Sequence, residues 1–548
     1  MKNSTIIIMT IGICFLWSCA SNTEEKQQPI AKHVVVIGFD GLSPDGLENA
    51  NTPVFDSVMA NGASTMHARA VLPSSSSTNW ASMIMGAGPE QHGITSNAWE
   101  KNNLTLPAIT QEENFIFPTI FNLTRQHKKD AEIGVIYDWT GFGRLFEKSA
   151  VDYDVNAKDE EETAKFAVAY LNKKKPTLTF VHFDHVDHAG HEFGHGAPEY
   201  YTSVEKADLL LGQVLKGIEK AGIAEETVVI ISSDHGGLGK GHGGESLQEM
   251  EIPFIVYGAS VKKGHRLTYP VYQYDNAATV AFILGIPTPM AWIGKPIKNA
   301  FDGYHQEDGY PILEQSKAPI IYPRAVLEKK AGGLFSDSTR VKLEHSNTGA
   351  SIKYTLDGTI PDKASTSYTS PFLLQKNAVV KAAMFSEEGA IISPVEEAFF
   401  RIKDSKNVAA VAYKVYYLDN LTSVPSLQNK QPDISGKSFE ITSDEVKAEI
   451  KANTAVSFTT TLNIGKEGAY TFYTRSDDGS KLWIDGEEIV DNDGDHGVKE
   501  VSGEVYLKRG VYPLEVIWFN GGGGGWLDVF YKEEQGVKQI LPSTIFIP

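Results

Sequence analysis

The sequence predicts a doubly wound α/β domain followed by two all-β sandwich modules. Up to about residue 303, short continuous apolar runs alternate with helical patterns. Beyond that point the helical patterns fade, and short alternating segments are separated by turns such as Asp357-Gly358 and Asp478-Gly479. Alternating strand and helix signals are typical of a largely parallel sheet that is covered on both faces. Closely spaced strands with turn residues between them are typical of β-sandwiches.

The strands expected in the first domain are apolar runs without a polar face. The first, at 33–38, reads HVVVIG, and similar runs follow at 133–136, 178–183 and 228–231. Such runs are typical of strands that are buried on both faces of a sheet. Helical patterns fall between them at 161–171 and 203–218. Because acidic residues come directly after several of these runs, we expect a ligand site at the carboxyl ends of the strands.

The predicted α/β domain spans 32–303, and the all-β part divides near 404–408 into modules at 320–402 and 410–548. A chain of 548 residues agrees with several domains. A composition with 41% hydrophobic and 10% aromatic residues is sufficient for packed cores. The net charge of -19 argues against a nucleic-acid polymer as a partner, because binding one requires clustered lysine and arginine.

The amino terminus is typical of a bacterial lipoprotein signal. A basic residue precedes an apolar run at 6–17, which has the length of a secretory signal rather than of a permanent membrane span. The segment Leu16-Trp17-Ser18-Cys19 resembles a lipobox. We therefore expect a signal peptide at 1–18, a lipid on Cys19, a polar tether at 19–31, and membrane attachment in the bacterial envelope, at the outer membrane. The alternative is an ordinary signal peptide in which Cys19 is incidental.

Acidic and histidine side chains at four places along the chain provide six ligands for divalent metal ions. They are Asp40, Asp187 with His191, Asp234 with His235, and His242. A cluster of serines at 74–77 lies between the first and the second place. Two metal ions about 4 Å apart with a hydroxyl between them form a phosphoryl-transfer site, where one ion activates the nucleophile and the other stabilises the leaving oxygen. The sequence therefore predicts an enzyme.

Residues 76–97 read SSTNWASMIMGAGPEQHGITSN and resemble the nucleotide pyrophosphatase/phosphodiesterase family of the alkaline phosphatase superfamily. In that family a nucleophilic hydroxyl residue stands three residues before an Asn, and a Pro-Glu-x-His-Gly-Ile stretch follows. Residues 89–94 match this stretch, Ser76 falls at the nucleophile position, where Thr is usual, and Asn97 falls at a later Asn. The resemblance implies an alkaline-phosphatase-like catalytic domain in which Ser76 attacks phosphorus and Asn97 donates its amide to a phosphate oxygen.

The expected position of Ser76 at the start of a helix also suits a nucleophile. Backbone N–H groups and the positive end of the helix dipole favour an alkoxide and an incoming phosphate, and metal coordination would activate the hydroxyl. Ser75 and Ser77 remain alternatives because they adjoin Ser76 in the same cluster. Without a catalytic role, the cluster would be a polar loop in which Ser77 or Thr78 caps the helix.

The same resemblance divides the metal ligands between two sites. Phe39-Asp40-Gly41, the Asp-x-x-Gly-His stretch at 187–191 and Asp234-His235-Gly236 match the metal motifs of the family. One ion is then expected on Asp40, Asp234, His235 and the oxygen of Ser76, and the other on Asp187, His191 and one more histidine. Mixed carboxylate and imidazole ligation suits zinc, with manganese as the alternative.

The third ligand of the second ion is expected to be His242. It lies between glycines, seven residues after His235, where no apolar face explains a histidine. The competing candidate is His265, and three further histidines crowd the second motif, at His185, His188 and His195.

The expected reaction is hydrolysis of a phosphodiester or pyrophosphate bond through a phosphoseryl intermediate, on extracellular or glycan-linked substrates. Trp139-Thr140-Gly141 falls where the family often has a Trp-Pro-Gly turn. The alternative is a phosphomonoesterase, which needs cations for the additional phosphate charge, and Arg144 and Lys148 are the nearby candidates. A sulfate-ester hydrolase of the same superfamily is less favoured. In such enzymes a Cys or Ser is followed by a spaced Pro and Arg, and neither Pro nor Arg occurs in 74–80. A degenerate, carbohydrate-binding surface lipoprotein is the third interpretation.

The two carboxyl-terminal modules resemble carbohydrate-associated domains. Residues 352–358 and 379–382 resemble the small sandwich at the end of chitobiases, and 470–486 are similar to the lectin-like sandwich named after anthrax protective antigen. In sugar-binding members of the latter, paired Asp residues hold calcium, which would here be Asp477 and Asp478. Asp-rich turns are also ordinary hairpin chemistry, so these residues have a purely structural alternative. After the glycines at 521–525, Trp526 is expected either to present an aromatic platform or to fold into the core.

Overall fold

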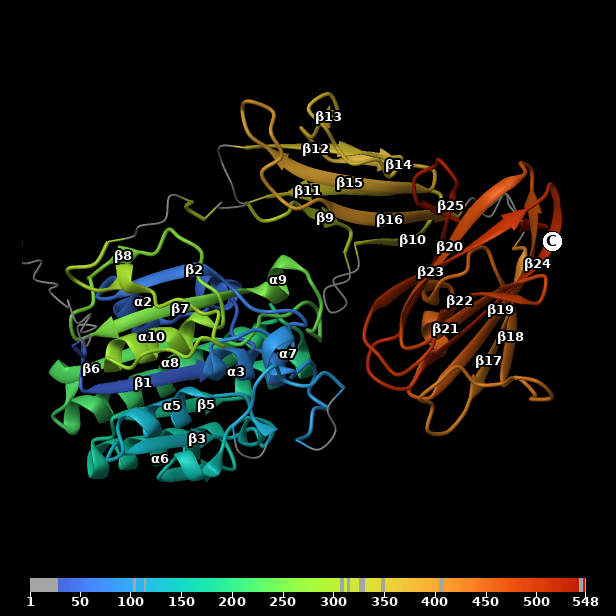
Figure 1. Ribbon diagram of the computed structural model, residues 1–548. Coiled ribbons are helices and arrows are strands. Elements are labelled where there is room, and N and C mark those ends of the chain that lie inside the picture. The colour runs from blue at the N-terminus through green and yellow to red at the C-terminus, as the bar shows by residue number, and fades with distance from the viewer. Residues whose placement is uncertain are drawn as a thin grey trace, which may run out of the picture.

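The computed structural model describes residues 28–101, 105–112, 115–305, 310–312, 316–324, 331–345, 350–403, 409–541 and 546–547. The predicted lipidation site, Cys19, lies outside these residues. Within them, no helix is both long and apolar enough to cross a membrane. An α/β domain is followed by a small β-sandwich and then by a larger one (Figure 1).

The described residues of the α/β domain form an eight-stranded sheet in the order β4-β3-β5-β1-β6-β7-β2-β8. Neighbouring strands from β4 to β6 are parallel, whereas β7 pairs antiparallel with β6 and with β2. The strands are β1 His33–Phe39, β2 Ala63–Arg69, β3 Ile133–Tyr137, β4 Tyr153–Asn156, β5 Leu178–Phe183, β6 Thr227–Ser232, β7 Glu251–Gly258 and β8 His265–Arg266.

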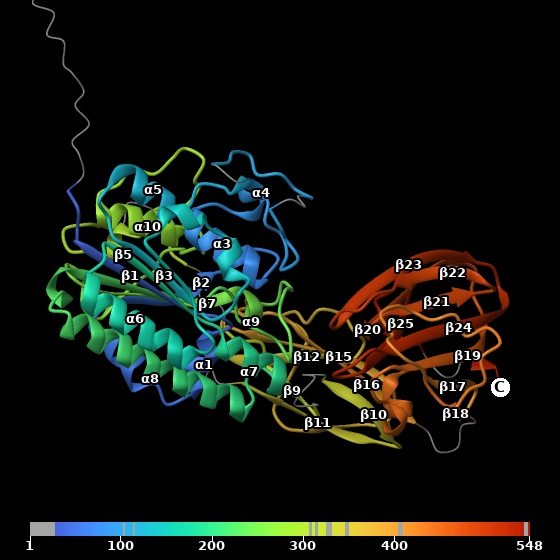
Figure 2. The same cartoon turned by 90° about the horizontal axis from the view of Figure 1, so that it is seen from below.

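Helices cover both faces of this sheet (Figure 2). Helices α3, α5 and α10 lie on one face, and α6 and α8 lie on the other. The helices are α1 Pro44–Asn49, α2 Pro53–Ala60, α3 Ser76–Met85, α4 Pro89–His92, α5 Ile120–His127, α6 Glu160–Lys174, α7 His185–Phe193, α8 Pro198–Lys220, α9 Leu247–Met250 and α10 Asp275–Leu284. The predicted doubly wound α/β class is therefore confirmed, and the predicted helical patterns at 161–171 and 203–218 lie within α6 and α8.

The two-sided burial of the sheet explains why its strands have no polar face. Along β1, Val34 and Val36 pack into the core on the side of α3, together with Trp80. Val35 and Ile37 pack into the core on the side of α8, together with Leu211. Because successive side chains of a strand point to opposite faces, both sets must be apolar when both faces are covered.

The second module is a small sandwich with its own core. Its described strands form one sheet in the order β10-β16-β15-β12-β13 and another in the order β14-β11-β9. The strands are β9 Ile320–Tyr322, β10 Gly332–Ser336, β11 Thr339–Glu344, β12 Ser351–Thr355, β13 Thr366–Ser367, β14 Phe372–Leu374, β15 Ala378–Phe385 and β16 Glu396–Lys403. Ile352, Val380 and Phe400 are among the side chains that fill the space between the sheets.

The third module is a larger sandwich. Its larger sheet has the order β18-β17-β19-β24-β21-β22, with β27 beside β19, and its smaller sheet has the order β23-β20-β25-β26. The strands are β17 Val411–Tyr417, β18 Ile434–Ser438, β19 Thr454–Ile464, β20 Gly468–Asp477, β21 Ser480–Ile484, β22 Glu487–Asn492, β23 Lys499–Leu507, β24 Gly510–Asn520, β25 Trp526–Glu533, β26 Gln539–Ile540 and β27 Phe546–Ile547. Both β-modules confirm the predicted all-β class of the carboxyl-terminal part.

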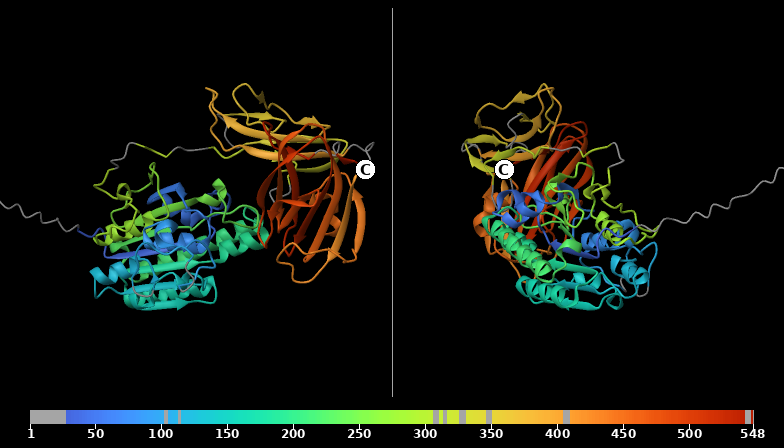
Figure 3. Two further views of the ribbon diagram at one scale, coloured as in Figure 1. Left: turned by 45° about the vertical axis from the view of Figure 1, so that its right-hand side comes forward. Right: turned by 90° about the vertical axis from the view of Figure 1, so that its left-hand side faces the viewer.

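The second and third modules pack against each other, and they lie side by side in both views of Figure 3. The rings of Phe399 and Phe530 meet across the contact with centroids 4.2 Å apart. Beside them Arg401 Nη1 lies 3.0 Å from Asp528 Oδ1, and both side chains are only 1% exposed. Buried apolar contacts and a buried ion pair hold these two modules in one arrangement.

Candidate metal centre and active site

The candidate site residues gather at the carboxyl ends of three neighbouring parallel strands. Asp40 directly follows β1, Asp187 and His191 lie on α7 after β5, and Asp234 and His235 follow β6. Because β5, β1 and β6 are adjacent, three segments that are far apart in sequence meet at one edge of the sheet. Gly41 permits this approach, since its φ is +67° and a Cβ there would lie 2.8 Å from the Cα of Asp187.

The first cluster consists of Asp40, Asp234 and His235, whose ligand atoms all lie within 4.8 Å of one another. All three side chains are at most 1% exposed. Trp80 Nε1 donates to Asp40 Oδ2 at 2.9 Å, and the backbone N–H of Gly41 donates to Asp234 Oδ1 at 3.1 Å. The remaining oxygens, Asp40 Oδ1 and Asp234 Oδ2, are buried without a hydrogen-bond partner in the described part of the chain.

The electrostatics of the first cluster call for a positive charge. Burial, together with the nearby Asp40 and Asp187, raises the pKa of Asp234 well above its usual range. Burial also lowers the pKa of His235 to about 4, so its imidazole is neutral. Two buried carboxylates beside a neutral imidazole are unfavourable as an isolated set, and a divalent cation would keep both acids ionised. The donor set therefore fits a metal ion.

The second cluster consists of Asp187, His191 and His242, again with ligand atoms within 4.8 Å of one another. His191 Nε2 lies 3.1 Å from Asp187 Oδ2 and 3.2 Å from His242 Nε2. The hydrogen bond with Asp187 raises the pKa of His191 to about 9. The His191 side chain is 49% exposed, so this cluster lies at the rim of the site, whereas the first cluster is enclosed.

Hydrogen bonds at Nδ1 orient the three candidate histidine ligands. His191, His235 and His242 place Nδ1 within 2.9 Å of the backbone carbonyls of Lys240, Gly236 and Ser74. An imidazole that donates from Nδ1 presents the lone pair of Nε2, which is the arrangement of metal-binding histidines. A cation between the Nε2 atoms of His191 and His242 would bind the lone pairs of both imidazoles.

Among the competing histidines, His265 lies in β8 at the edge of the sheet and joins neither cluster. His195 lies closer, with Nε2 3.7 Å from Asp187 Oδ1. Its ring fills the space over Gly190 and Gly237, where a Cβ would come within 2.3 Å and 2.2 Å of the imidazole. The glycines at 190 and 237 were the signal in the sequence, because a residue without a Cβ permits another side chain to pack directly against the backbone.

Among Ser74, Ser75 and Ser76, it is the Ser76 hydroxyl that contacts the first cluster, whereas Ser77 Oγ is buried without a hydrogen-bond partner in the described part of the chain. Ser76 is the first residue of α3, is 4% exposed, and places Oγ 3.3 Å from His235 Nε2. Ser74 Oγ instead donates to the carbonyl of Gly244 at 2.7 Å, and Ser75 Oγ bonds with Thr78 Oγ1 at 2.9 Å. These contacts turn the neighbouring hydroxyls away from the site that Ser76 faces.

Asn97 lies beside the start of α3 and is exposed. Its Oδ1 accepts a hydrogen bond from the backbone N–H of Ser77 at 2.8 Å, which leaves the amide N–H groups directed elsewhere. Arg144 Nη2 donates to the carbonyl of Asn97 at 2.8 Å, and Nη1 of the same guanidinium pairs with Glu100 at 2.8 Å. The guanidinium therefore fixes the loop that carries Asn97.

Two buried side chains that the sequence interpretation did not assign support Asp40. Besides Trp80, His182 in β5 places Nε2 3.5 Å from Asp40 Oδ2 and Nδ1 3.4 Å from Asp138 Oδ1. Burial lowers the pKa of His182, but the nearby carboxylates of Asp138 and Asp40 outweigh this effect and raise the pKa to about 9. A histidine inside an otherwise apolar strand was the available signal, because such a residue needs a buried partner.

The matched stretch at 89–94 serves to join helices rather than to reach the site. Ser82 Oγ and His92 Nε2 are 2.9 Å apart, and the backbone N–H of Ile94 donates to His92 Nδ1 at 3.0 Å. Burial lowers the pKa of His92 to about 3, so this imidazole stays neutral. The stretch thus braces α4 against α3, the helix that begins with Ser76.

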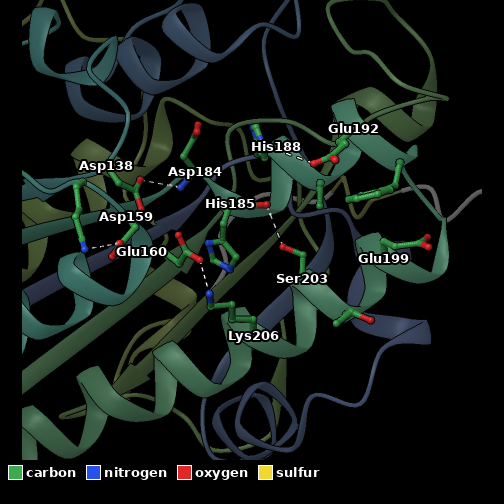
Figure 4. A pocket seen from close by; sticks show the side chains of 14 residues that line it. Asp138, Asp159, Glu160, Asp184, His185, His188, Glu192, Glu199, Ser203 and Lys206 are labelled. Carbon is green, nitrogen blue, oxygen red and sulfur yellow. Dashed lines mark hydrogen bonds and ion pairs between the residues drawn. The ribbon is translucent and has the colours of Figure 1, made fainter. Parts of the chain in front are cut away.

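A cavity of about 530 Å³ lies on the other side of α7 from the metal ligands (Figure 4). Helix α7 presents Asp187 and His191 to the second cluster, and presents His185, His188 and Glu192 to this cavity. Lys206 of α8 pairs there with Glu160 at 2.5 Å. The cavity is therefore separate from the two clusters.

In the third module, backbone donors hold the carboxylate of Asp478, one of the two candidate calcium ligands. Asp478 Oδ2 accepts from the N–H of Gly521 at 2.8 Å, and its Oδ1 accepts from the N–H of His496 at 3.1 Å. Neither Asp477 nor Asp478 belongs to a cluster of three or more acidic or histidine ligands among the described residues. Trp526 is half-buried and donates to Asp528 Oδ2 at 2.7 Å, which is intermediate between the two positions expected from the sequence.

The three domains match known families in the predicted order. Residues 34–239 match the family model described as type I phosphodiesterase / nucleotide pyrophosphatase. Residues 330–394 match the chitobiase/beta-hexosaminidase C-terminal domain, and residues 409–542 match the PA14 domain. All three resemblances stated from the sequence are thereby confirmed.

The curated relatives are similar to this chain over part of its length. An uncharacterized pyrophosphatase/phosphodiesterase of Schizosaccharomyces pombe is 24% identical over 218 residues, covering 37% of this chain and 44% of that protein. The human bis(5'-adenosyl)-triphosphatase ENPP4 is 25% identical over 228 residues, covering 39% of this chain and 49% of that protein. The chain thus spans about half the length of the curated relatives it matches. A solved structure of murine ectonucleotide pyrophosphatase / phosphodiesterase 5 with AMP aligns at 17% identity with a TM-score of 0.42, covering 47% of this chain and 96% of that chain.

Proposed function

We propose that the α/β domain hydrolyses phosphodiester or pyrophosphate bonds through a covalent phosphoseryl intermediate on Ser76. The observation that carries this proposal is the position of Ser76 Oγ, 3.3 Å from His235 Nε2 and beside buried carboxylate oxygens that have no hydrogen-bond partner among the described residues. The match of residues 34–239 to the phosphodiesterase family supports the same chemistry.

The residues present fit two divalent ions, one on Asp40, Asp234 and His235 and one on Asp187, His191 and His242. Such a pair lowers the pKa of a nearby hydroxyl and stabilises the negative charge of the phosphoryl group. Mixed carboxylate and imidazole donors suit zinc, with manganese as the alternative.

The chain's own groups then account for the covalent steps. Ser76 Oγ loses its proton and forms a bond to phosphorus, while the bond from phosphorus to the leaving oxygen breaks and that oxygen takes up a proton. Water next attacks phosphorus of the phosphoseryl diester, the bond from phosphorus to Ser76 Oγ breaks, and that oxygen takes up a proton while the phosphomonoester product leaves. The amino-terminal end of α3 favours the charge that develops on the phosphoryl oxygens, and the amide of Asn97 would donate to one of them.

Diester hydrolysis is favoured over monoester hydrolysis because the two cations considered for a terminal phosphate are engaged elsewhere. Arg144 binds Glu100 and the carbonyl of Asn97. Lys148 Nζ pairs with Asp154 Oδ1 at 2.9 Å and contacts the hydroxyl of Tyr137 at 2.9 Å. Neither side chain is held ready for a second phosphate charge.

A substrate panel tests this proposal on protein supplied with zinc or manganese. We expect turnover of an aryl phosphodiester to exceed turnover of the corresponding monoester and sulfate ester. A preference for the monoester would replace the diesterase assignment while sparing the site geometry, and activity on none of the three esters would favour a degenerate carbohydrate-binding protein. Mass spectrometry of acid-quenched wild type should find the covalent adduct on Ser76, and Ser76→Ala should lack it.

We also propose that Cys19 anchors the protein in the envelope and that the third module binds carbohydrate with calcium at Asp477 and Asp478. The lipobox-like segment supports the anchor, and the PA14 match supports the sugar-binding role. Cys19→Ser should release the protein from membranes or block its processing, because it removes the sulfur that would carry the lipid. Stable anchoring needs more than one acyl chain, so a remaining acyl chain would not suffice. Unchanged membrane partitioning of this variant would refute the anchor.

A further inference from the structure

A groove of about 620 Å³ crosses the outer face of the larger sheet of the third module. Strands β17, β19, β24, β21 and β22 form its floor and far wall, and the loop at 424–428 forms its near wall. In Figure 1, β17, β18, β19 and β24 lie on the side of this module that is farther from the α/β domain, and β21 and β22 are labelled nearer to that domain. The described residues that line the groove do not include Asp477 or Asp478.

Strand alternation explains which side chains reach the groove. On β21, Leu482 and Ile484 face the core of the sandwich, whereas Lys481 and Trp483 face the groove. On the neighbouring β24, Val516 faces the core while Glu515 and Ile517 face outward. Trp483 lies on the outer face of the sheet, where it does not serve the core and lines the groove as a half-buried aromatic side chain.

The groove offers flat aromatic surface on an otherwise polar floor. Trp483 is half-buried, and Tyr416, which is 4% exposed, lies under the loop that forms the near wall. A pyranose ring presents an apolar face of C–H groups and an edge of hydroxyls. An indole provides apolar contact area with little loss of conformational entropy on binding, so it suits the C–H face of such a ring.

Polar groups of both kinds surround the aromatic surface. The charged side chains among the described lining residues are Lys414, Lys481, Glu488, Asp493 and Glu515. Two lysines against three carboxylates leave nearly no net charge, which disfavours both polyanions and polycations. Ordered donors and acceptors close to an apolar ring are instead complementary to a ligand rich in hydroxyls.

These polar groups are already held in place. Lys481 Nζ lies 3.2 Å from Glu488 Oε2 and 3.0 Å from Asp491 Oδ2. Ser457 Oγ donates to Glu515 Oε1 at 3.2 Å across the neighbouring strands. Because preorganised groups lose less entropy when a ligand binds, the affinity of this groove for a sugar is higher than that of the same groups on mobile side chains.

We propose that this groove binds a neutral glycan chain without calcium. The site is distinct from the calcium-dependent one proposed at Asp477 and Asp478, and it does not rest on the hydrolase activity of the α/β domain. Because none of its lining residues belongs to the α/β domain, a polysaccharide bound there leaves the phosphoesterase site free. The groove would then hold the enzyme on a glycan that surrounds its substrate.

Affinity electrophoresis of the full chain tests the proposal, with starch, xylan, galactomannan and mixed-linkage β-glucan as neutral probes and heparin and polygalacturonate as acidic ones. We expect retardation by at least one neutral polysaccharide in the presence of a chelator. Trp483→Ala should weaken that binding by about tenfold or more, since it removes the stacking surface. The matched control is Tyr506→Ala, which removes a 64% exposed aromatic from the smaller sheet and should bind like wild type.

Thermal unfolding of each variant separates loss of binding from loss of fold. Where Trp483→Ala lowers the unfolding midpoint, Trp483→Leu keeps apolar bulk on the sheet without a flat ring and should still lose binding. Binding of Trp483→Ala and Trp483→Leu at wild-type strength would overturn the proposal. Retardation only by the acidic polysaccharides, loss of retardation on chelation, or no retardation by any neutral probe would overturn it as well.

Discussion

Buried acids are neutralised in opposite ways in two regions of the molecule. At the contact between the second and third modules, Asp528 faces Arg401 at 3.0 Å and accepts hydrogen bonds from Thr442 and Trp526. At the end of β1 and β6, Asp40 Oδ1 and Asp234 Oδ2 are equally buried but have no hydrogen-bond partner among the described residues. A buried charge is costly unless it is paired. The interface provides the partner from the chain itself, and the sheet edge requires one from outside.

This difference separates structural acids from functional ones better than burial alone. Asp528 holds two modules together, so its replacement should alter stability and leave chemistry unchanged. Asp40 and Asp234 each have one carboxylate oxygen that accepts a hydrogen bond and one buried oxygen without a hydrogen-bond partner among the described residues. This arrangement lowers the stability of the metal-free chain and leaves an oxygen of each acid available to a metal ion. Substitutions at the metal site should lower turnover, whereas substitutions at the Asp528 ion pair should lower stability and leave turnover unchanged.

The largest effect is expected at Ser76. Ser76→Ala should lower turnover of an aryl phosphodiester by several orders of magnitude, because it removes the nucleophile, while metal content stays close to that of wild type. Ser75→Ala is the matched control, since its hydroxyl bonds with Thr78 and should be dispensable. Near wild-type turnover by Ser76→Ala together with inactive Ser75→Ala would shift the nucleophile by one residue. If neither variant loses turnover, attack by water replaces the covalent route.

The second cluster should depend on His242. His242→Ala should lose about one equivalent of metal per chain and lower turnover roughly 10³-fold, because one ion provides several kcal/mol of transition-state stabilisation. Metal analysis by mass spectrometry measures the loss directly. His265→Ala, at the edge of the sheet, serves as the control and should retain both ions; the reverse pattern would assign the sixth ligand to His265.

Asn97→Ala should cost on the order of 10²-fold in turnover, as expected for one donor to a transition-state oxygen. The loss should fall on kcat more than on KM, since the hydrogen bond strengthens as charge develops. Asn97→Asp keeps the oxygen that accepts from Ser77 but removes the amide donor, so it should be at least as impaired. A variant that raises KM alone would make Asn97 a binding residue for the ground state.

Arg144 is expected to act through Asn97, and its effect should be smaller. Arg144→Ala removes the donor to the Asn97 carbonyl and should lower turnover by about tenfold through loss of positioning. In the double variant with Asn97→Ala the additional loss should disappear, because the loop then has no catalytic group to position. Additive losses in the double variant would instead give Arg144 a direct contact with substrate.

The smallest effect on turnover is expected at the buried ion pair. Arg401→Ala leaves Asp528 buried without its cation, which should cost about 3–5 kcal/mol of stability in the carboxyl-terminal modules. Turnover of a small aryl diester should remain at the wild-type value, since the pair is remote from the α/β site. Denaturant unfolding and steady-state kinetics on the same samples check both parts, and a parallel loss of turnover would show that the modules contribute to the active site.

Local sequence patterns predicted the elements that local chemistry determines. The apolar runs at 33–38 and 178–183 gave the buried strands because a sheet covered on both faces needs apolar residues at every position. Asp40 and Asp234 were expected at one edge of the sheet because the carboxyl ends of parallel neighbouring strands lie together. The structure brings Ser76 and His242 to the expected clusters, where the glycine-flanked position of His242 was the useful signal.

The remaining contacts depend on residues that are far apart in the chain. The approach of Trp80 and His182 to Asp40 joins three segments whose spacing carries no pattern. The packing of complete sandwiches likewise produces the pairing of Arg401 with Asp528 and the groove around Trp483. Composition shows that such side chains exist, but only the register of the strands places them together.

The metal content of the wild-type chain tests the central claim most directly. Protein refolded or purified with zinc or manganese and freed of unbound ions by gel filtration should carry two equivalents per chain, measured by inductively coupled plasma mass spectrometry. Because the ions bind only the folded site, chelation should also lower the unfolding midpoint. One equivalent would limit the site to a single cluster, and no bound ion under these conditions would contradict the claim that the unpartnered acids at the ends of β1 and β6 require an external cation.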